Sequence, residues 1–582
     1  MSALLTFVFL LQTSQQIHSG DVAFHAGFAA MKSNDLPRAE SEFAKVVRLM
    51  PGSAAGHGAL GAVLLAEGKL AAAVPELEKA HRLDDRDQTT TLNLANAYCS
   101  QRRFADSVTL FRSLQPAVTL SAESTLAYAT SLVGTGKVQD ATLKLQKAAT
   151  ANPENAPLHD ALGAVLAQQQ RYDEARAELE KALTLDPNSS SAHFHLGSLD
   201  LVEQRLPEAV DELQAAGKLA PNDLNILLQL GRAQIAQRLD EDALETLRHA
   251  HRIAPSSVDA TYSLALALQN AGETKEAVPL FAVAASARPG DAQVLTNYAL
   301  ELVQDGQARQ AVPIYERALK LDAANPVLLE DLGVAYLQQS DLDHAIAEFR
   351  AGLALPNQGG AQAAALHYDL GLALKLKDRL PEAVAELLLA EAANPSLPDP
   401  PYTLGVLYMQ TGEFAKAAEQ MEAAVRMRPE NGDAWSVLGS TYRQMNVPGK
   451  AVPALRHAIE LLPNQPGSHI TLAAILAQQG DQAGAAAERK IAAELSRIAV
   501  SRQRSDFALG TGTALLKIGK VEDAVTQLRL AVAADPGYAT PHRMLADALG
   551  RQGNAAEAAL ERQKADRLDR ERAEQSVKQP GP

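Results

Sequence analysis

Apolar residues along the chain follow a helical spacing that stops and restarts at regular intervals. In most intervals an apolar residue stands at position 7, another at position 11 and, beyond a break, a third at position 24. Because residues four apart lie on one face of a helix, this spacing predicts a helix on each side of the break. The pattern therefore predicts pairs of antiparallel helices joined by a tight turn.

The interval is 34 residues long. Two series of prolines are spaced by that distance: Pro153, Pro187, Pro221, Pro255 and Pro289, then Pro395, Pro429 and Pro463. A frame laid from Gly20 gives ten units over 20–363, with four extra residues near 357–363. Four units occupy 364–504, with five extra residues near 497–504, and two units with a cap occupy 505–572. The sequence does not decide whether the two insertions act as hinges.

Small residues occupy two positions of the repeat. Position 20 is Ala in fifteen units and Ser107 in the other, and position 8 is Gly in ten units and Ala in six. Such residues allow helices to approach closely, and added methylenes there cost about 1–3 kcal/mol by overpacking. Position 15 is Gly or Asn in ten units, which predicts a left-handed residue at the end of the first helix.

These positions together resemble the tetratricopeptide repeat family. The unit at 432–465 carries the family's pattern in Trp435, Leu438, Gly439, Tyr442, Ala451, Leu455, Ala458 and Pro463. The resemblance implies an all-α, right-handed superhelical solenoid of about sixteen 34-residue helix-turn-helix repeats, with a groove lined by the first helices. Arg489 replaces the position-24 hydrophobe of its unit and Pro116 comes early, so the sequence allows a break or altered pitch at these places.

Both ends of the chain lie outside the repeat frame. Residues 1–19 form a leader with an apolar run from Ala3 to Leu11, which is too short to span a bilayer. Either it is the core of a signal peptide, which implies a periplasmic or secreted protein, or it is an apolar leader or misplaced start, which leaves the protein cytoplasmic. Residues 573–582 are predicted to be a disordered tail, because Pro580 and Pro582 end any helix.

Composition and charge exclude several classes of function. The net charge of −15 disfavours nucleic acid as a partner. Cys99 is the single cysteine, so an intrachain disulfide or a multi-cysteine metal site is excluded. The Gly-Lys pairs at 68–69, 136–137 and 519–520 occupy the turn of the repeat and lack the strand of a phosphate-binding loop. We therefore expect no cofactor.

The histidines fit the repeat better than a metal site. His193 and His195, like His249 and His251, are two residues apart and do not share a helix face. Six histidines stand at position 4, where the family has a bulky packing residue: His57, His159, His193, His367, His469 and His542. No catalytic cluster stands outside the frame. We therefore expect no metal site and no enzymatic activity.

The groove implied by the resemblance is the candidate site. In the family, positions 2, 5, 9, 12 and 13 of the first helix face it. The aromatic candidates are Phe24, Phe194, Tyr262, Tyr368 and Tyr402. The polar candidates are Asn96, Arg232, Gln304, Gln338, Gln410, Arg443 and Gln444. Rings flanked by amides suit the capture of a peptide, although the same rings would also suit packing against the preceding unit.

The sequence thus predicts a non-catalytic scaffold for protein–protein interaction, which binds a peptide or protein segment in its groove. One alternative is an accessory or regulatory subunit of an enzyme or of an envelope secretion or assembly complex. A third hypothesis is a cryptic transferase, which predicts turnover of a nucleotide-sugar.

Overall fold

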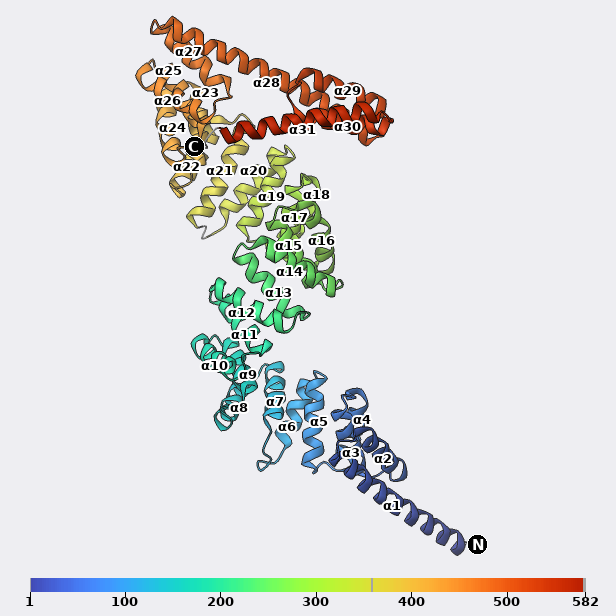
Figure 1. The fold of residues 1–582 in the computed structure, drawn as a ribbon. Helices are drawn as coiled ribbons and strands as arrows, with labels where there is room; N and C mark the ends of the chain where they lie inside the picture. Colours follow the sequence, from blue (N-terminus) through green and yellow to red (C-terminus); the bar gives the residue numbers. More distant parts are fainter. Residues whose placement is uncertain (1, 357–358, 579–582) are drawn as a thin grey trace. The chain divides into compact units, whose positions relative to one another are not determined.

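The chain folds into helices that follow one another in antiparallel pairs. The computed structural model describes the backbone of residues 2–356 and 359–578, and within these ranges the side chains of 15–571. These described residues form 31 helices and no strand (Figure 1). The all-α repeat architecture expected from the sequence is therefore confirmed. The chain divides into two compact units, Met1–Asp305 and Gly306–Pro582.

In the first unit, odd-numbered helices are the first helices of the repeats and even-numbered helices are the second. The first helices are α1 (Ser2–Lys32), α3 (Ala54–Ala66), α5 (Gln88–Ser100), α7 (Ala122–Gly134), α9 (Ala156–Gln168), α11 (Ser190–Val202), α13 (Leu224–Ala236), α15 (Val258–Asn270) and α17 (Ala292–Gln304). The second helices are α2 (Leu36–Leu49), α4 (Leu70–Leu83), α6 (Phe104–Ser113), α8 (Val138–Ala151), α10 (Tyr172–Leu185), α12 (Leu206–Leu219), α14 (Asp240–Ile253) and α16 (Thr274–Ala287).

The unit Gly306–Pro582 begins with the helix that completes a repeat. Pairs of helices then follow as far as one long helix. Its helices are α18 (Ala308–Leu321), α19 (Pro326–Gln338), α20 (Leu342–Ala354), α21 (Gly360–Leu376), α22 (Leu380–Ala393), α23 (Asp399–Thr411), α24 (Phe414–Met427), α25 (Gly432–Gln444), α26 (Pro448–Leu461), α27 (Pro466–Gln478), α28 (Gln482–Lys517), α29 (Val521–Ala534), α30 (Ala539–Gln552) and α31 (Ala555–Lys578).

A left-handed residue ends the first helix of each pair. The ten Gly and Asn residues predicted for this place all have positive φ, for example Gly68 at +74°. Six other residues adopt the same conformation: Arg102, Gln170, Gln204, Arg238, Ser340 and Asp378. The amide of Lys69 donates to the carbonyl of Leu64 at 2.8 Å, so the turn satisfies a carbonyl that the helix leaves open.

This geometry predicts opposite effects for two substitutions. Gln170→Gly should raise the free energy of unfolding by about 1 kcal/mol, because a side chain is strained at the φ of +61° found there. Gly68→Ala should lower it by a similar amount for the same reason. The urea midpoint of the full chain measures both. Gly467→Ala, in α27 at an ordinary φ, is the control, and a lower midpoint for Gln170→Gly would contradict the argument.

First helices also contact the first helices of neighbouring repeats. In the first unit α5 contacts α7 and α13 contacts α15, and in the second unit α19 contacts α21 and α25 contacts α27. Among the described residues, no pair of second helices makes contacts of this extent. Because the first helices approach one another more closely, they lie on the inner side of the local curvature within each unit.

The two insertions become helix instead of loop. Residues 360–363 form the start of α21, while 357–358 lie outside the described residues. The second insertion lies inside α28, a continuous helix of 36 residues that joins two repeats. No glycine or proline occurs between Gly484 and Gly510, so nothing ends the helix there. At Pro116, in contrast, α6 ends early at Ser113.

The two ends of the chain continue the helices beside them. The leader is contiguous with the first repeat, since α1 runs from Ser2 to Lys32. In the part of the chain that the structure describes, no helix combines the length and apolar character that a bilayer crossing needs. The helix α31 runs to Lys578, and no proline interrupts it before Pro580; the disorder expected from residue 573 stays a prediction. Residues 579–582 lie outside the described residues.

Candidate functional site

The aromatic candidates lie half-buried on the first helices. The ring of Phe24 packs edge-on against Phe43 of its own repeat, with centroids 5.7 Å apart. Tyr262 packs in the same way against Phe281 at 6.0 Å, and its hydroxyl accepts a hydrogen bond from Asn297 Nδ2 at 2.8 Å. Asn297 belongs to the following repeat. These rings therefore contact their own repeat and the following one, whereas the sequence suggested packing against the preceding repeat. Each ring remains partly exposed to solvent.

The other three rings are placed in the same way. Tyr368 forms a side-chain hydrogen bond with Thr403 of the following repeat. Tyr402 is half-buried beside the apolar core around Leu438. Phe194 is half-buried beside Leu213, and its ring centroid is 5.5 Å from that of His195. Burial raises the pKa of Tyr262, Tyr368 and Tyr402, so these hydroxyls stay protonated and can donate to a ligand.

The polar candidates differ in exposure. Those exposed to solvent are Arg232, Gln304, Gln338, Gln410 and Gln444. Arg443 is half-buried, and so is Asn96, whose Nδ2 donates to Ser124 Oγ at 3.1 Å. The structure therefore brings Gln338, Tyr368, Tyr402, Gln410, Arg443 and Gln444 together on four consecutive first helices of the second unit, α19, α21, α23 and α25.

Sequence reasoning missed three carboxylates on the same helices. Glu330 and Asp331 lie on α19, and Asp369 lies on α21. Burial raises the pKa of Asp331 to about 6, and the nearby Glu330 adds to the effect. Burial also raises the pKa of Asp369 to about 7, with Glu330 and Asp331 adding to it. The signal that could have found them is an acid at position 6 in two consecutive repeats, Asp331 and Asp369, with Glu330 beside the first at position 5.

The three carboxylates lack basic partners. Gln362 donates a hydrogen bond to Glu330, but no ion pair joins the three to a Lys, Arg or His among the described residues. The hydroxyl of Tyr315 is fully buried without a hydrogen-bond partner in the same set, and the nearby Asp331 contributes to raising its pKa. Three neighbouring carboxyl groups without basic partners therefore lie on α19 and α21.

A different carboxylate is paired within the first unit. Asp160, on α9, accepts from Ser191 Oγ at 2.6 Å and lies 2.7 Å from His195 Nδ1. Both partners come from α11 of the following repeat. His193 instead contacts Glu212 of its own second helix, at 2.6 Å. The two histidines thus engage different partners, as expected for residues two apart that do not share a helix face.

Four of the position-4 histidines join consecutive repeats: His57, His159, His193 and His542. His367 and His469 contact a glutamate of their own second helix. His159 Nδ1 lies 2.5 Å from Glu178 Oε2 of its own second helix, and its Nε2 lies 3.0 Å from the carbonyl of Pro153, which closes the preceding repeat. Trp435 donates its indole N–H to the carbonyl of Pro429 at 2.8 Å in the same place. A carboxylate and a carbonyl both accept, so the ring satisfies both when both of its nitrogens carry protons.

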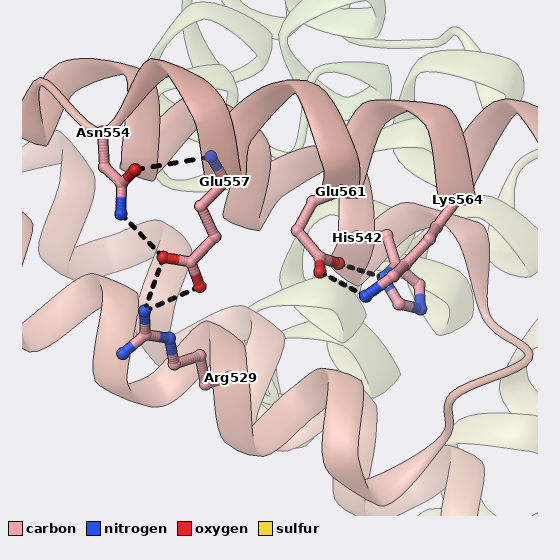
Figure 2. A network of polar contacts seen from close by, with 6 residues as sticks. All are labelled: Arg529, His542, Asn554, Glu557, Glu561 and Lys564. Atoms are coloured by element: carbon pink, nitrogen blue, oxygen red, sulfur yellow. Dashed lines mark hydrogen bonds and ion pairs between the residues drawn. The ribbon is translucent and has the colours of Figure 1, made fainter.

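Figure 2 shows the last of these pairs, beside a second polar network. His542 and Lys564 both contact Glu561, and Arg529 contacts Glu557, which also binds Asn554. Burial opposes ionisation of Glu561, but hydrogen bonds from Lys564 and His542 hold its pKa below the usual range. Within the described residues, no three His, Cys, Asp or Glu side chains are grouped to hold a metal ion.

Helical hairpins of constant length, stacked through small residues and closed by left-handed turns, define a helical-repeat solenoid. The profile described as Tetratricopeptide repeat matches residues 26–88, 225–292, 298–360, 402–466 and 509–572, which is more than half of the chain. A second profile of that description matches 466–488, and a TPR repeat profile matches 163–199. The chain belongs to the tetratricopeptide repeat family. Its repeats support protein–protein interaction in general, and the fold is typically a non-catalytic scaffold.

Solved structures of repeat proteins are similar over parts of the chain. The APC/C hetero-tetramer Cut9-Hcn1 is 14% identical, with 80% of this chain and 99% of that chain covered and a TM-score of 0.37. MamA is 27% identical, with 28% and 93% covered and a TM-score of 0.26. YrrB, described as a TPR protein with an unusual peptide-binding site, is 24% identical, with 32% and 95% covered and a TM-score of 0.28. None of the curated proteins compared with the chain matches it.

Proposed function

We propose that this protein is a scaffold without catalytic activity, and that the first-helix face of α19, α21, α23 and α25 binds a peptide segment of a partner protein. The observation that carries the proposal is that three features occur together on this face. Half-buried rings offer an apolar surface at Tyr368 and Tyr402, exposed amides offer hydrogen bonds at Gln338 and Gln410, and carboxylates lack basic partners. Rings anchor a peptide, and polar groups fix its register.

The charge on this face favours a segment that carries Lys or Arg. A cation placed near Asp331 and Asp369 would favour their ionised forms, which burial now opposes. Because these carboxylates are already partly desolvated and lack a basic partner, a cation beside them offsets part of the cost of burying their charge. The partner is therefore expected to present a basic side chain beside apolar residues.

Selection of peptides from a random phage-displayed library on the full chain tests this function. We expect enrichment of peptides with Lys or Arg next to apolar residues. Binding of a selected peptide should weaken at least about tenfold in Tyr402→Ala and in the double variant Asp331→Asn/Asp369→Asn. It should also weaken with added salt, because the attraction is electrostatic.

The matched control is Leu388→Ala, at an exposed apolar residue on the second helix α22. This variant should bind the selected peptide as the unchanged chain does. Failure to enrich any sequence, enrichment of acidic peptides, or an equal loss in Leu388→Ala would each overturn the proposed site.

A further inference from the structure

Along the long helix α28, two faces are exposed to solvent that are buried at all the remaining repeat junctions. Position 3 of the first helix is buried in all described repeats that follow another repeat, with one exception. Leu328 and Leu366 are 1% and 0% exposed, whereas Phe507, at the same position, is 79% exposed. Position 10 shows the same contrast, because Ala514 is exposed while Ala335 and Ala373 are fully buried. The repeat that starts at 505 therefore has no neighbour on its N-terminal side.

The repeat before it is open on the opposite side. Position 24 is a buried hydrophobe in the other described repeats, such as Phe349 and Leu455, except in the last repeat, which has Arg562. In the repeat at 466 it is the exposed Arg489. Because α28 serves both as its second helix and as the first helix of the next repeat, the chain runs straight on where it elsewhere folds back (Figure 1).

An exposed apolar stripe follows α28 at intervals of seven residues. Its members, all exposed, are Ala486, Ala493, Val500, Phe507 and Ala514. Seven residues make nearly two helical turns, so these side chains share one face. The helix is 36 residues long, or about 54 Å, and the stripe covers most of it. Such a spacing is typical of a helix that packs along another helix.

The stripe carries both a knob and a hole. Phe507 projects into solvent as the knob. A depression of about 400 Å³ surrounds Ala493, and it is lined by Ile470, Ala474, Arg489, Ala492, Ala493 and Ser496. Knob and hole each lie seven residues from Val500, in opposite directions along the helix. A two-fold axis at Val500 therefore places Phe507 of one helix over Ala493 of an identical antiparallel helix.

Regular repeat junctions place position 3 of one repeat against positions 27 and 28 of the repeat before it. A Cβ built on Gly56, at position 3, would lie 2.7 Å from Val46 Cγ1, at position 27. A Cβ built on Gly217, at position 28 of its repeat, lies 3.8 Å from Ile226 Cγ2, at position 3 of the next. The residues at these two positions around α28 are Ala493 and Phe507. Both lie on one straight helix, about 21 Å apart along its axis, so they cannot meet within one chain.

We propose that α28 is a dimerisation helix, and that a second copy of this chain packs antiparallel along it with Phe507 of each copy in the depression around Ala493 of the other. Val500 then meets Val500, and Ala486 meets Ala514, where small residues allow close approach. The same register brings Glu494 of one copy within about one turn of Arg504 of the other. The interface is isologous, so each contact occurs twice. An unrelated helix is not expected to carry both a cavity for Phe507 and a side chain that fills the depression around Ala493.

Sedimentation and light scattering of the full chain at micromolar concentrations test the proposal. We expect a dimer for the unchanged chain and a monomer for Phe507→Glu and for Ala493→Glu, with an unchanged circular dichroism spectrum. Leu143→Glu is the matched control, because Leu143 is 66% exposed on α8 of the first unit. That variant should remain dimeric. A monomeric unchanged chain, or a dimer that survives Phe507→Glu, would overturn the proposal.

Cysteine pairs test the orientation in a Cys99→Ser background. Val500→Cys should form a disulfide-linked dimer on mild oxidation, because the two-fold axis brings the residue against itself. Ala486→Cys should not crosslink alone, but it should crosslink with Ala514→Cys when the two proteins are mixed. Crosslinking of Ala486→Cys with itself would indicate parallel helices and would contradict the antiparallel register.

Discussion

Gly163→Val should destabilise the first unit by about 3 kcal/mol. A Cβ at Gly163 would lie 2.5 Å from Leu179 Cγ and 3.0 Å from the carbonyl oxygen of Ala175, on the second helix of the same repeat. Leu179 is fully buried, and the carbonyl belongs to a helix that would have to move as a whole. Overpacking of this kind costs about 1–3 kcal/mol, and the rigid backbone contact places valine at the upper end.

Gly449→Val provides the matched control for this substitution. Gly449 also lies in a helix, α26, but a Cβ there meets no atom within 4 Å. Urea denaturation of both variants, followed by circular dichroism, should therefore show a large fall in midpoint for Gly163→Val and a small change for Gly449→Val. Equal midpoints in the two variants would show that close helix approach at position 8 does not limit stability.

Asp369→Asn should stabilise the second unit by about 2 kcal/mol at pH 8. Burial and two neighbouring carboxylates raise the pKa of Asp369 to about 7, so the ionised form that predominates at pH 8 is costly in the folded state. An amide of the same shape removes that charge. A pKa unit corresponds to about 1.4 kcal/mol, and the part of the side chain that solvent still reaches reduces the total gain. The melting temperature should rise by roughly 4–8 °C.

The same pKa shift fixes the sign of the pH dependence. The folded chain holds a proton on Asp369 up to about pH 7, whereas an unfolded carboxyl releases it near pH 4. The stabilising contribution of the proton is therefore fully present below about pH 4 and is lost as the pH rises through about 7. Asp331, whose pKa is raised to about 6, acts in the same direction.

Melting temperatures between pH 5 and pH 8 measure this effect. We expect the unchanged chain to lose stability from pH 5 to pH 8 and Asp369→Asn to lose less. Glu419→Gln, at an exposed carboxylate on α24, is the control and should behave as the unchanged chain does. A slope that is the same in all three proteins would contradict the role given to Asp369.

The charge and the candidate groove were only partly accessible to sequence reasoning. The aromatic residues at position 5 could be located by counting, yet counting could not tell that the Tyr262 hydroxyl accepts from Asn297 of the following repeat. Likewise, nothing in the spacing of Asp331 and Asp369 indicates that both become partly buried beside Glu330. Such burial depends on how far one repeat is rotated against the next, which no single repeat encodes.

The sequence by itself determined the helical hairpin, because its causes are local. Small residues at positions 8 and 20, a left-handed residue at position 15 and an apolar residue at position 24 act within one repeat, so their spacing predicts the structure directly. Only the tertiary structure decided that the residues near 497–504 continue a helix instead of breaking it, and that Phe507 is left uncovered. A helix that runs on and a loop that folds back differ little in local propensity, and the choice between them depends on whether the next repeat finds a face to pack against.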